Sequence, residues 1–416
     1  MKILFVVPRS PWPPFAGQAR LAFNRALSLR QMGHDVYLFA YGYNIPCTDI
    51  TAKVRSSSAF TSFVVSSFGL HRLLFLAIRS FLAWLFDSVP LVALLYTPDV
   101  IRNHFAMYIS SAKFDVVHFY SINTFPLWIS ASNERIPFVI DLVDSMTLNL
   151  RPRIEKLPVL LRLIARSEFH RVRKFESNLP SYPYCFAYSV VGDKDAEYLS
   201  LFRPSPTKFT PNIVCHSIGV DIPVSEQPSG HISHHPPFDI LFFGSLYYYP
   251  NIEAISWFLQ EVCPRLNKTL SFNIIIAGAK PSRYLIDLCR KFPSVTLISN
   301  PRNMSPLIAS SSITVAPLRS GSGQQFKVIE SLALATPVVT TSLAAMPLGL
   351  EHNVHILVAD SPSEFAHSIE LLISDQALYS RLAAAGYSHV VNKFSWFSKS
   401  LLLEQMYLDA ISELNK

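Results

Sequence analysis

Short apolar runs and helical patterns alternate along the first half of the chain. Residues 3–8 form a continuous apolar run, residues 19–32 carry a helical period, and residues 35–40 form the next apolar run. Continuous runs, rather than alternating ones, are typical of parallel strands that helices cover on both faces. The pattern therefore predicts an α/β fold with a doubly wound parallel sheet.

The same pattern starts again in the second half. Residues 238–243 form a buried strand run, and residues 252–266 carry the helical period that follows it. The stretch between the halves is rich in Pro, Ser and His and has no apolar period, which is typical of a linker. The prediction is two Rossmann-like domains, a linker and a last helical segment, in chain order 1–222, 223–237, 238–392 and 393–416.

Composition narrows the class of partner. The chain has 416 residues, enough for two domains, and half of them are hydrophobic while only 16% are charged. The net charge of +7 favours anionic partners. No dense Lys/Arg run with interleaved aromatic residues is present, so we expect no nucleic-acid partner. Nucleotide diphosphates and an anionic membrane surface fit the charge better.

The cysteine pattern and the N-terminus bear on the compartment. The five cysteines are widely spaced and contain no Cys-x-x-Cys pair, which predicts neither a disulfide framework nor a zinc site: Cys47, Cys185, Cys215, Cys263 and Cys289. A reducing, cytoplasmic compartment fits this usage. The N-terminal apolar run covers only residues 3–7, so it is interpreted as a first strand and not as a signal peptide.

The segment from Val315 to Thr341 has the pattern of an anion site. A strand run ends at Pro317, and a loop with Arg319 and then Gly321, Ser322 and Gly323 leads into a predicted helix over residues 324–335. A glycine loop that opens a helix points backbone N–H groups at the positive end of the helix dipole, where phosphate can bind.

Two charged residues on this helix extend the pattern. Lys327 adds a mobile positive charge, and Glu330 lies three residues later on the same face. The alternative is an ordinary strand-loop-helix unit with a surface Lys–Glu pair.

This segment resembles the donor-binding motif of GT-B glycosyltransferases, specifically the retaining enzymes of glycosyltransferase family 4, also called group 1. In that family a glutamate binds the ribose hydroxyls of the nucleotide sugar, and Glu330 is the matching residue. The family usually has a second glutamate eight residues earlier, where this chain has Ser322. That departure resembles a subgroup with a Gly-Ser-Gly signature followed by Lys and Glu, and it leaves the contact to the donor sugar open.

Two further loops carry the resemblance. The stretch FFGSLYYYPN resembles the start of the family's donor domain, which implies that Gly244 leaves space for the donor diphosphate. Many members have Arg and Lys just after it, but this chain has neither, so Arg319 and Lys327 would supply most of the positive charge. In the first loop of the chain, Gly17 is the candidate for contact with the diphosphate, or else a plain turn glycine. The resemblance also implies two domains that face a central cleft, with the last helix crossing back to the first domain.

Two aspartates lie at the end of the predicted strand at residues 137–142. Carboxylates at the carboxyl end of a strand in a doubly wound sheet face the crevice where ligands bind, so Asp141 and Asp144 are candidates for acceptor contact. The stretch VIDLVDS resembles the family's aspartate form of a strand end near the reacting hydroxyl. For Asp144 the alternative is a helix N-cap. His118, one strand earlier, is interpreted as a core or strand-end histidine.

Two segments bear on a membrane. Residues 60–96 are rich in Leu, Phe and Trp, but Arg72 and Arg79 interrupt them, so we expect no full membrane span. An amphipathic helix in the membrane interface and a pair of buried helices are the two alternatives. Residues 151–178 are predicted to form one basic helix, which could flank an anionic acceptor or the membrane, or be a solvated charged face.

The resemblance implies a retaining glycosyltransferase that moves a sugar from a nucleotide-diphosphate donor to a lipid-linked or polysaccharide acceptor in cell-surface glycan synthesis. It implies a metal-independent reaction without a cofactor. The cysteine usage, together with the apolar and basic segments, predicts a cytoplasmic protein, peripheral on the inner face of the membrane. The alternatives are a GT-B-like nucleotide-sugar epimerase and a catalytically silent GT-B scaffold. Asp193 and Asp195 form an Asp-x-Asp pair, but they precede a helical pattern and are interpreted as its first-turn acids and not as metal ligands.

Overall fold

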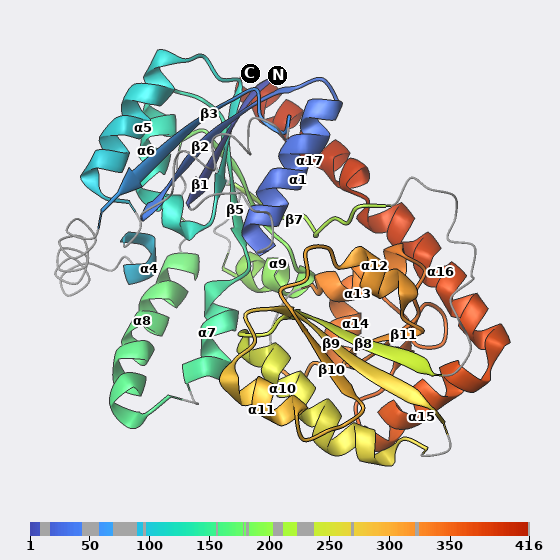
Figure 1. Cartoon of the computed structure of the whole chain (residues 1–416). Coiled ribbons are helices and arrows are strands. Elements are labelled where there is room, and N and C mark those ends of the chain that lie inside the picture. Colours follow the sequence, from blue (N-terminus) through green and yellow to red (C-terminus); the bar gives the residue numbers. More distant parts are fainter. Residues whose placement is uncertain are drawn as a thin grey trace. The chain divides into compact units, whose positions relative to one another are not determined.

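The computed structural model divides the chain into two compact units. Unit 1 comprises Met1–Ser217 and Trp396–Lys416, and unit 2 comprises Ile218–Ser395 (Figure 1). The residues that the structure describes are 1–8, 17–43, 58–69, 90–94, 97–154, 157–177, 179, 183–202, 211–222, 237–267, 270–320 and 324–414. The predicted linker falls almost wholly outside them. Each unit is an α/β domain with a parallel sheet, which confirms the predicted fold class.

Unit 1 is built on seven parallel strands in the order β3-β2-β1-β4-β5-β6-β7. The strands are β1 (Lys2–Pro8), β2 (Asp35–Tyr43), β3 (Ser62–Phe68), β4 (Val116–Tyr120), β5 (Phe138–Val143), β6 (Cys185–Val190) and β7 (Asn212–Cys215). The strand order reverses between β1 and β4, which makes this pair the switch point of a doubly wound sheet. The sequence pattern did not predict β3, an edge strand whose apolar run is short and partly exposed.

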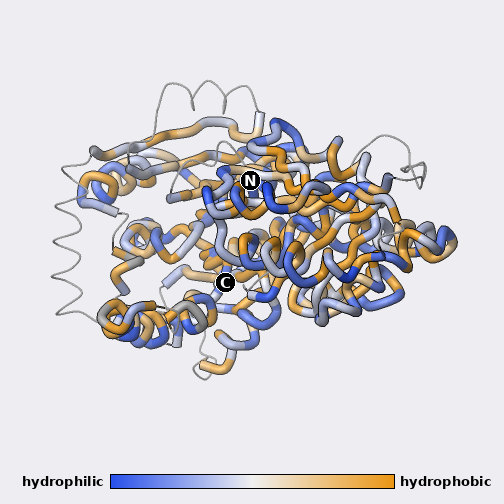
Figure 2. The backbone as a smooth tube through the Cα atoms, turned by 60° about the horizontal axis from the view of Figure 1, so that its bottom comes forward, coloured by the Kyte–Doolittle hydropathy of each residue, from blue (hydrophilic) through white to orange (hydrophobic). Residues whose placement is uncertain are grey.

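Helices cover both faces of this sheet. On β1, Ile3, Phe5 and Val7 pack in one core with residues of α1 and α17, while Leu4 and Val6 pack in another with residues of α5 and α6. This two-sided burial explains the continuous apolar run. The helices are α1 (Gly17–Gln31), α4 (Leu91–Leu94), α5 (Asp99–Ser111), α6 (Phe125–Asn133), α7 (Met146–Ile154), α8 (Val159–Ser177), α9 (Asp193–Ser200) and α17 (Trp396–Leu414). Figure 2 shows hydrophobic and hydrophilic residues alternating along the helices.

The single basic helix predicted over residues 151–178 is wrong. The structure has two helices there, with α7 ending at Ile154 and α8 starting at Val159. Pro158 explains the break, because its ring disfavours the helical conformation of Leu157 and it has no N–H to donate. Its carbonyl instead accepts the bond from Arg162 N that begins α8.

Unit 2 is built on six parallel strands in the order β10-β9-β8-β11-β12-β13. The strands are β8 (Phe238–Ser245), β9 (Phe272–Ala279), β10 (Val295–Ser299), β11 (Ile313–Ala316), β12 (Val338–Thr340) and β13 (Leu357–Val358). Taken in chain order within the unit, this is the arrangement 3-2-1-4-5-6 of the Rossmann fold. Its switch point lies between β8 and β11.

The helices of unit 2 are shorter and more broken than the apolar period predicts. The predicted helix at 252–266 is divided into α10 (Tyr249–Trp257), a π-helical turn (Phe258–Val262) and a 3-10 turn (Cys263–Arg265). The helix predicted over residues 324–335 covers only Phe326–Ala333 and is α13. The others are α11 (Arg283–Cys289), α12 (Ser305–Ser310), α14 (Ser342–Ala345), α15 (Pro362–Ser374) and α16 (Gln376–Phe394).

The apolar segment at residues 60–96 is only partly described. Its beginning forms β3 and not a helix, whereas residues 70–89, which include the expected amphipathic pattern, lie outside the described residues. Among the helices that the structure describes, none combines the length and the apolar character needed to cross a bilayer.

Candidate functional site

In unit 2, glycines line the carboxyl ends of the central strands. Gly244 at the end of β8 has φ +146° and Gly278 at the end of β9 has φ +159°, values that residues with a Cβ rarely adopt. A Cβ on Gly278 would lie 1.7 Å from the carbonyl oxygen of Gly244, so the two strand ends approach as closely as backbone can. A Cβ on Gly244 would lie 3.1 Å from Asn251 Nδ2 and 3.6 Å from Lys327 Nζ. Gly244 thus borders the amine of Lys327.

Lys327 is a buried residue of α13, not a mobile surface charge. Only 8% of the residue is exposed, and its Nζ donates a 2.6 Å hydrogen bond to Asn251 Oδ1. The same amine lies 4.4 Å from the centroid of the Phe242 ring. Burial lowers the pKa of Lys327 to about 7, while the nearby Glu330 carboxylate opposes that shift. The amine can therefore gain a proton when an anion arrives.

Asn251 is the residue of this cluster that the sequence did not single out. It lies in the first helical turn of α10, and its Nδ2 donates to Ser245 O at 2.9 Å, which directs its Oδ1 to Lys327. Asn251 is 76 positions from Lys327 in the chain. The available signal was its position in the first helical turn after the glycine-bearing strand end of β8, although the sequence pattern predicts a loop there.

Arg319 lies after β11 and is exposed. Its guanidinium carbon is 5.1 Å from the centroid of the Trp257 ring, a cation–π contact with the end of α10. The hydroxyl of the next residue, Ser320, donates to the carboxylate of Glu253, also on α10. The beginning of the loop is thus fastened to α10.

The remaining donor-site candidates have these places. Glu330 is half-buried on α13, near enough to Lys327 to influence its pKa. Gly321, Ser322 and Gly323 lie outside the described residues. Gly17, in unit 1, is the first residue of α1. The structure therefore brings together Gly244, Lys327 and Glu330 of the predicted donor residues and adds Asn251.

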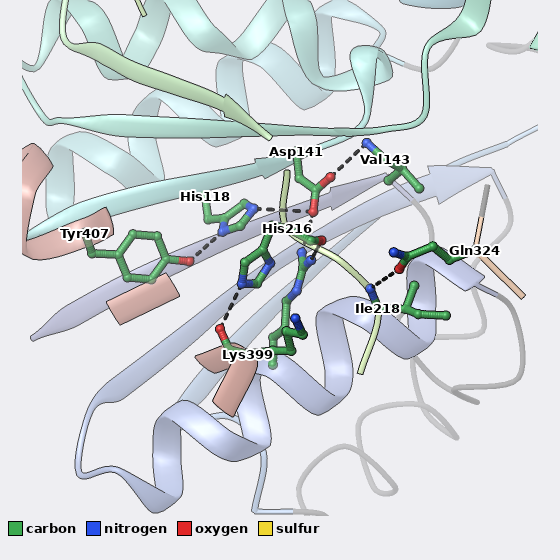
Figure 3. A network of polar contacts seen from close by, with 9 residues as sticks. His118, Asp141, Val143, His216, Ile218, Gln324, Lys399 and Tyr407 are labelled. Atoms are coloured by element: carbon green, nitrogen blue, oxygen red, sulfur yellow. Dashed lines mark hydrogen bonds and ion pairs between the residues drawn. The ribbon is translucent and has the colours of Figure 1, made fainter. Parts of the chain in front are cut away.

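In unit 1, Asp141 points into the domain. It is 1% exposed, forms an ion pair with Arg25 of α1, and accepts a bond from Val143 N at 2.8 Å on its Oδ1 (Figure 3). Arg25 is fully buried and also donates to His216 O at 3.2 Å. Burial disfavours the charge on Arg25, but the Asp141 carboxylate outweighs it and raises the pKa of the guanidinium. Asp141 is thus a partner of Arg25, a residue that the sequence analysis did not single out.

His118 is fully buried beside this pair, which confirms its interpretation as a core histidine. Its Nδ1 pairs with the hydroxyl of Tyr407 on α17, and its Nε2 lies 4.0 Å from Asp141 Oδ2. Burial, together with the charge of Arg25, lowers the pKa of His118 well below its usual value. The imidazole is therefore neutral at physiological pH.

The turn after β5 holds a backbone conformation that is unusual for its residue. Val143 has φ +69°, which is an outlier for a β-branched side chain. Several bonds fix the turn. Val143 N donates to Asp141 Oδ1, and Asp144 N donates to Leu142 O at 2.9 Å. Val191 N donates to Val143 O at 2.8 Å, and Ser145 N donates to Asp195 Oδ1 at 2.9 Å. Such conformations persist only where surrounding contacts enforce them, and they cluster at functional sites.

The buried carboxylate of Glu176 on α8 also stabilises this turn through hydrogen bonds. Its carboxylate accepts from Ser145 Oγ at 2.8 Å, from Met146 N at 2.6 Å and from Thr147 N at 3.2 Å, at the start of α7. Burial raises the pKa of Glu176, and these donors oppose the shift. Neither this role of Glu176 nor the bond from Ser145 to Asp195 is visible in the sequence, because the partners are distant in the chain.

Asp144, the second candidate aspartate, lies in this turn. Its side chain is half-buried, between the fixed residues Val143 and Ser145. The helix-cap role considered for Asp144 belongs to Ser145, whose Oγ accepts from Leu148 N at 3.3 Å. Of the two candidate aspartates, Asp144 is thus the more accessible.

Comparison with known proteins bears on both units. Residues 237–375 match the family model described as glycosyl transferases group 1. Unit 2 is a group 1 glycosyltransferase domain. The matched residues of this domain include Gly244, Asn251, Lys327 and Glu330 and run from the start of β8 through α15.

The whole chain has the fold of GT-B glycosyltransferases. A glycosyltransferase from Rickettsia africae aligns with a TM-score of 0.65 and 13% identity, covering 99% of this chain and 98% of the other. HepE from Anabaena, in complex with UDP and glucose, aligns with a TM-score of 0.61 and 15% identity, covering 98% and 100%. A variant of TarM from S. aureus, in complex with fondaparinux, α-GlcNAc-glycerol and UDP, aligns with a TM-score of 0.68 and 10% identity, covering 99% and 100%.

A curated sequence relative matches a smaller part of this chain than the solved structures do. An uncharacterized 44.6 kDa protein in the cps region of Klebsiella pneumoniae is 24% identical over 166 residues. The match covers 37% of this chain and 42% of the length of that protein.

Proposed function

We propose that this glycosyltransferase moves a sugar from a nucleotide-diphosphate donor to a lipid-linked or polysaccharide acceptor, with retention, in cell-surface glycan synthesis. The observation that carries the proposal is the buried amine of Lys327 beside Gly244, at the switch point of the group 1 domain. Burial lowers the pKa of the Lys327 amine to about 7, so the amine can take up a proton when a negatively charged diphosphate binds. Gly244, which has no side chain, leaves space for the diphosphate at the end of β8.

The donor half of the reaction needs stabilisation of the leaving diphosphate. Charge grows on its oxygens as the bond to the sugar breaks, and Lys327, Arg319 and the N–H groups before α13 neutralise it without a metal. Glu330 accepts hydrogen bonds from the ribose hydroxyls. We assign Gly17 and the loop with Gly321, Ser322 and Gly323 to binding the remaining parts of the nucleotide-sugar donor.

The acceptor half needs a hydroxyl placed on the face that the diphosphate leaves. The anomeric carbon's bond to the phosphate oxygen breaks, its bond to the acceptor oxygen forms on the same face, and a phosphate oxygen takes the acceptor proton. Asp144 positions the hydroxyl. Asp141, first considered for the same role, acts through Val143 by fixing the turn, because its carboxylate is committed to Arg25.

The similar proteins support the substrate classes. HepE is known in complexes with UDP, with UDP and glucose, and with UDP-glucose. A sequence relative is encoded in a cps region, which supports polysaccharide synthesis. We place the protein in the cytoplasm, peripheral on the inner face of the membrane, where nucleotide sugars and a lipid-linked acceptor meet.

The proposal is tested by incubating the full chain with a panel of nucleotide sugars and candidate acceptors, after a thermal-shift screen selects the base. Mass spectrometry of the products separates the alternatives. Transfer to an acceptor supports the proposal, a new epimer of the donor indicates the epimerase, and donor binding without turnover indicates the silent scaffold.

Gly244→Ala is expected to weaken binding of the nucleoside diphosphate by about ten-fold or more, the equivalent of about 1.4 kcal/mol. The added Cβ would push against Asn251 and Lys327, and the backbone at φ +146° would be strained. Gly349→Ala is the matched control, because Gly349 also has a positive φ, +59°, and a Cβ added there would meet nothing within 4 Å. Isothermal titration calorimetry should show loss of affinity for the first variant alone; equal losses would contradict the placement of the diphosphate.

Asp144→Asn is expected to lower kcat by about 10²-fold or more while donor affinity stays unchanged, because the carboxylate acts on the acceptor. Asp115→Asn, an exposed aspartate just before β4 and so at the amino end of the sheet, is the control. Steady-state transfer rates and donor titration separate the two effects. Full transfer by Asp144→Asn would remove this residue from the acceptor site.

A further inference from the structure

Helix α8 exposes an unusual number of aliphatic side chains at its beginning. Val159 is 75% exposed, Leu163 62%, Ile164 56% and Leu161 52%. Among the described side chains between Val159 and His170, none is buried. Isolated exposed aliphatic residues are ordinary, but here four lie within one and a half turns. Val159 and Leu163 are on one side of the helix and Leu161 and Ile164 on the opposite side, so together they form an apolar patch around its beginning that calls for a partner.

The other end of α8 is fixed in unit 1. Val172 and Phe175 are buried, and the Phe175 ring lies 6.5 Å from that of Trp128 in the core. Glu176 is held by the start of α7. Figure 1 shows α8 beside α7, its packing partner. The helix is therefore anchored near its C-terminus, and its first half carries the apolar patch outward from that anchor.

Basic residues continue from Val159 and Leu163 along one side of the helix. Positions 159, 163, 166, 170, 173 and 174 share a face at helical spacing, and all of them are exposed: Val159, Leu163, Arg166, His170, Arg173 and Lys174. In the whole of α8, five basic side chains stand against two acidic ones, and one of the acidic ones, Glu176, is buried. The exposed face thus passes from apolar to cationic along its length.

We propose that α8 docks unit 1 on an anionic lipid membrane surface, an inference that rests on the peripheral membrane location proposed above. The aliphatic side chains at the beginning of the helix enter the boundary between headgroups and acyl chains, and Arg166, Arg173 and Lys174 bind the lipid phosphates. Aliphatic residues beside a basic face are the pattern of helices that bind at a membrane interface. The charge argues against a second copy of this chain as the occupant, because two basic faces repel each other.

Vesicle sedimentation with the full chain tests the docking helix. The probes are vesicles of phosphatidylcholine with phosphatidylglycerol in a two to one ratio, and vesicles of phosphatidylcholine alone. We expect the protein to sediment with the anionic vesicles at low salt and to be released at high salt. Arg166→Glu with Arg173→Glu should weaken partitioning at least about 30-fold, since each basic residue near anionic lipid contributes about five-fold.

Matched variants separate docking from general effects. Arg283→Glu with Lys291→Glu makes the same charge change at exposed positions of unit 2 and should leave sedimentation unchanged. Leu163→Gln with Ile164→Gln should also weaken partitioning, whereas Leu401→Gln with Leu402→Gln, at exposed positions of α17, should not. The nucleotide-induced thermal shift of the α8 variants should equal that of the parent, which shows that they fold and keeps this test independent of the donor site.

Three results would overturn the proposal. The first is recovery of the parent protein wholly in the supernatant with anionic vesicles. The second is equal partitioning of the parent and of both α8 variants. The third is a dimer in light scattering that Leu163→Gln with Ile164→Gln converts to monomer, because the apolar patch would then belong to a second copy.

Discussion

Lys327→Met is expected to lower kcat/KM for sugar transfer by about 10²–10³-fold, the loss typical of removing one group that stabilises charge in the transition state. Methionine is apolar and of similar length, so it can occupy the buried site beside Phe242. The amine that neutralises the leaving diphosphate is then absent, and the other cation of the site, Arg319, lies at the exposed beginning of the loop. Initial rates of transfer from the donor selected by thermal shift measure the effect.

Two companion variants test whether the loss of transfer is specific to the Lys327 amine. Lys291→Met, at an exposed position of the same unit, should transfer at the parent rate. Asn251→Asp keeps the lysine but places a carboxylate against its amine, so the diphosphate would meet an already neutralised cation and bind weakly. Should Lys327→Met or Asn251→Asp retain full transfer, the diphosphate does not bind at this cluster.

Arg25→Leu is expected to destabilise unit 1 by about 3–5 kcal/mol, because it leaves the Asp141 carboxylate buried without its counter-charge. Asp141 cannot turn to water, since its side chain is 1% exposed. Urea unfolding should be followed by hydrogen exchange of peptides from each unit, because a protein of two domains need not unfold in one transition. Peptides from β4 and β5 should open at lower urea in the variant, while those of unit 2 are unchanged.

The double variant Arg25→Leu with Asp141→Asn provides the matching control. Removing both charges should cost less than the sum of the two single changes, as expected for residues that interact directly. Additive costs, or a cost below about 1 kcal/mol for Arg25→Leu alone, would contradict the role given to the ion pair. Transfer by Asp141→Asn should show a lower kcat at unchanged donor affinity, because the carboxylate fixes the turn that presents Asp144.

The sequence predicted the fold well where a strand is buried on both faces. The apolar runs of β1 and β8 follow from helices on either side of the sheet, so they signal the architecture directly. β3 was missed because an edge strand with a short, half-exposed run lacks that signal. The prediction of one helix over residues 151–178 is wrong because Pro158 interrupts the helix, a break that the basic composition of the segment does not show.

The sequence predicted candidate residues within single segments of the chain. It could not predict the contacts between residues of different segments. Lys327 stood out by its place after a glycine loop, but its partner Asn251 lies 76 positions away and only the folded sheet brings them together. Asp141 was correctly placed at a strand end, yet whether a carboxylate faces the ligand or the core depends on Arg25, 116 positions distant. Spacing in sequence carries no information on such pairs.

Proton uptake on binding of the nucleoside diphosphate tests the central claim most directly. The pKa of Lys327 is lowered to about 7 in the free protein, so at pH 8 most molecules hold a neutral amine. A bound diphosphate stabilises the charged form, so binding raises this pKa and takes up a proton. Affinity should then fall as pH rises above 7.

The measurement is calorimetric titration at pH 8 in buffers of different ionisation enthalpy, with the nucleoside diphosphate that gives the largest thermal shift. We expect uptake of close to one proton by the parent and of none by Lys327→Met. Equal proton uptake by the two proteins, or tight binding without uptake by the parent, would contradict the claim that Lys327 binds the donor diphosphate.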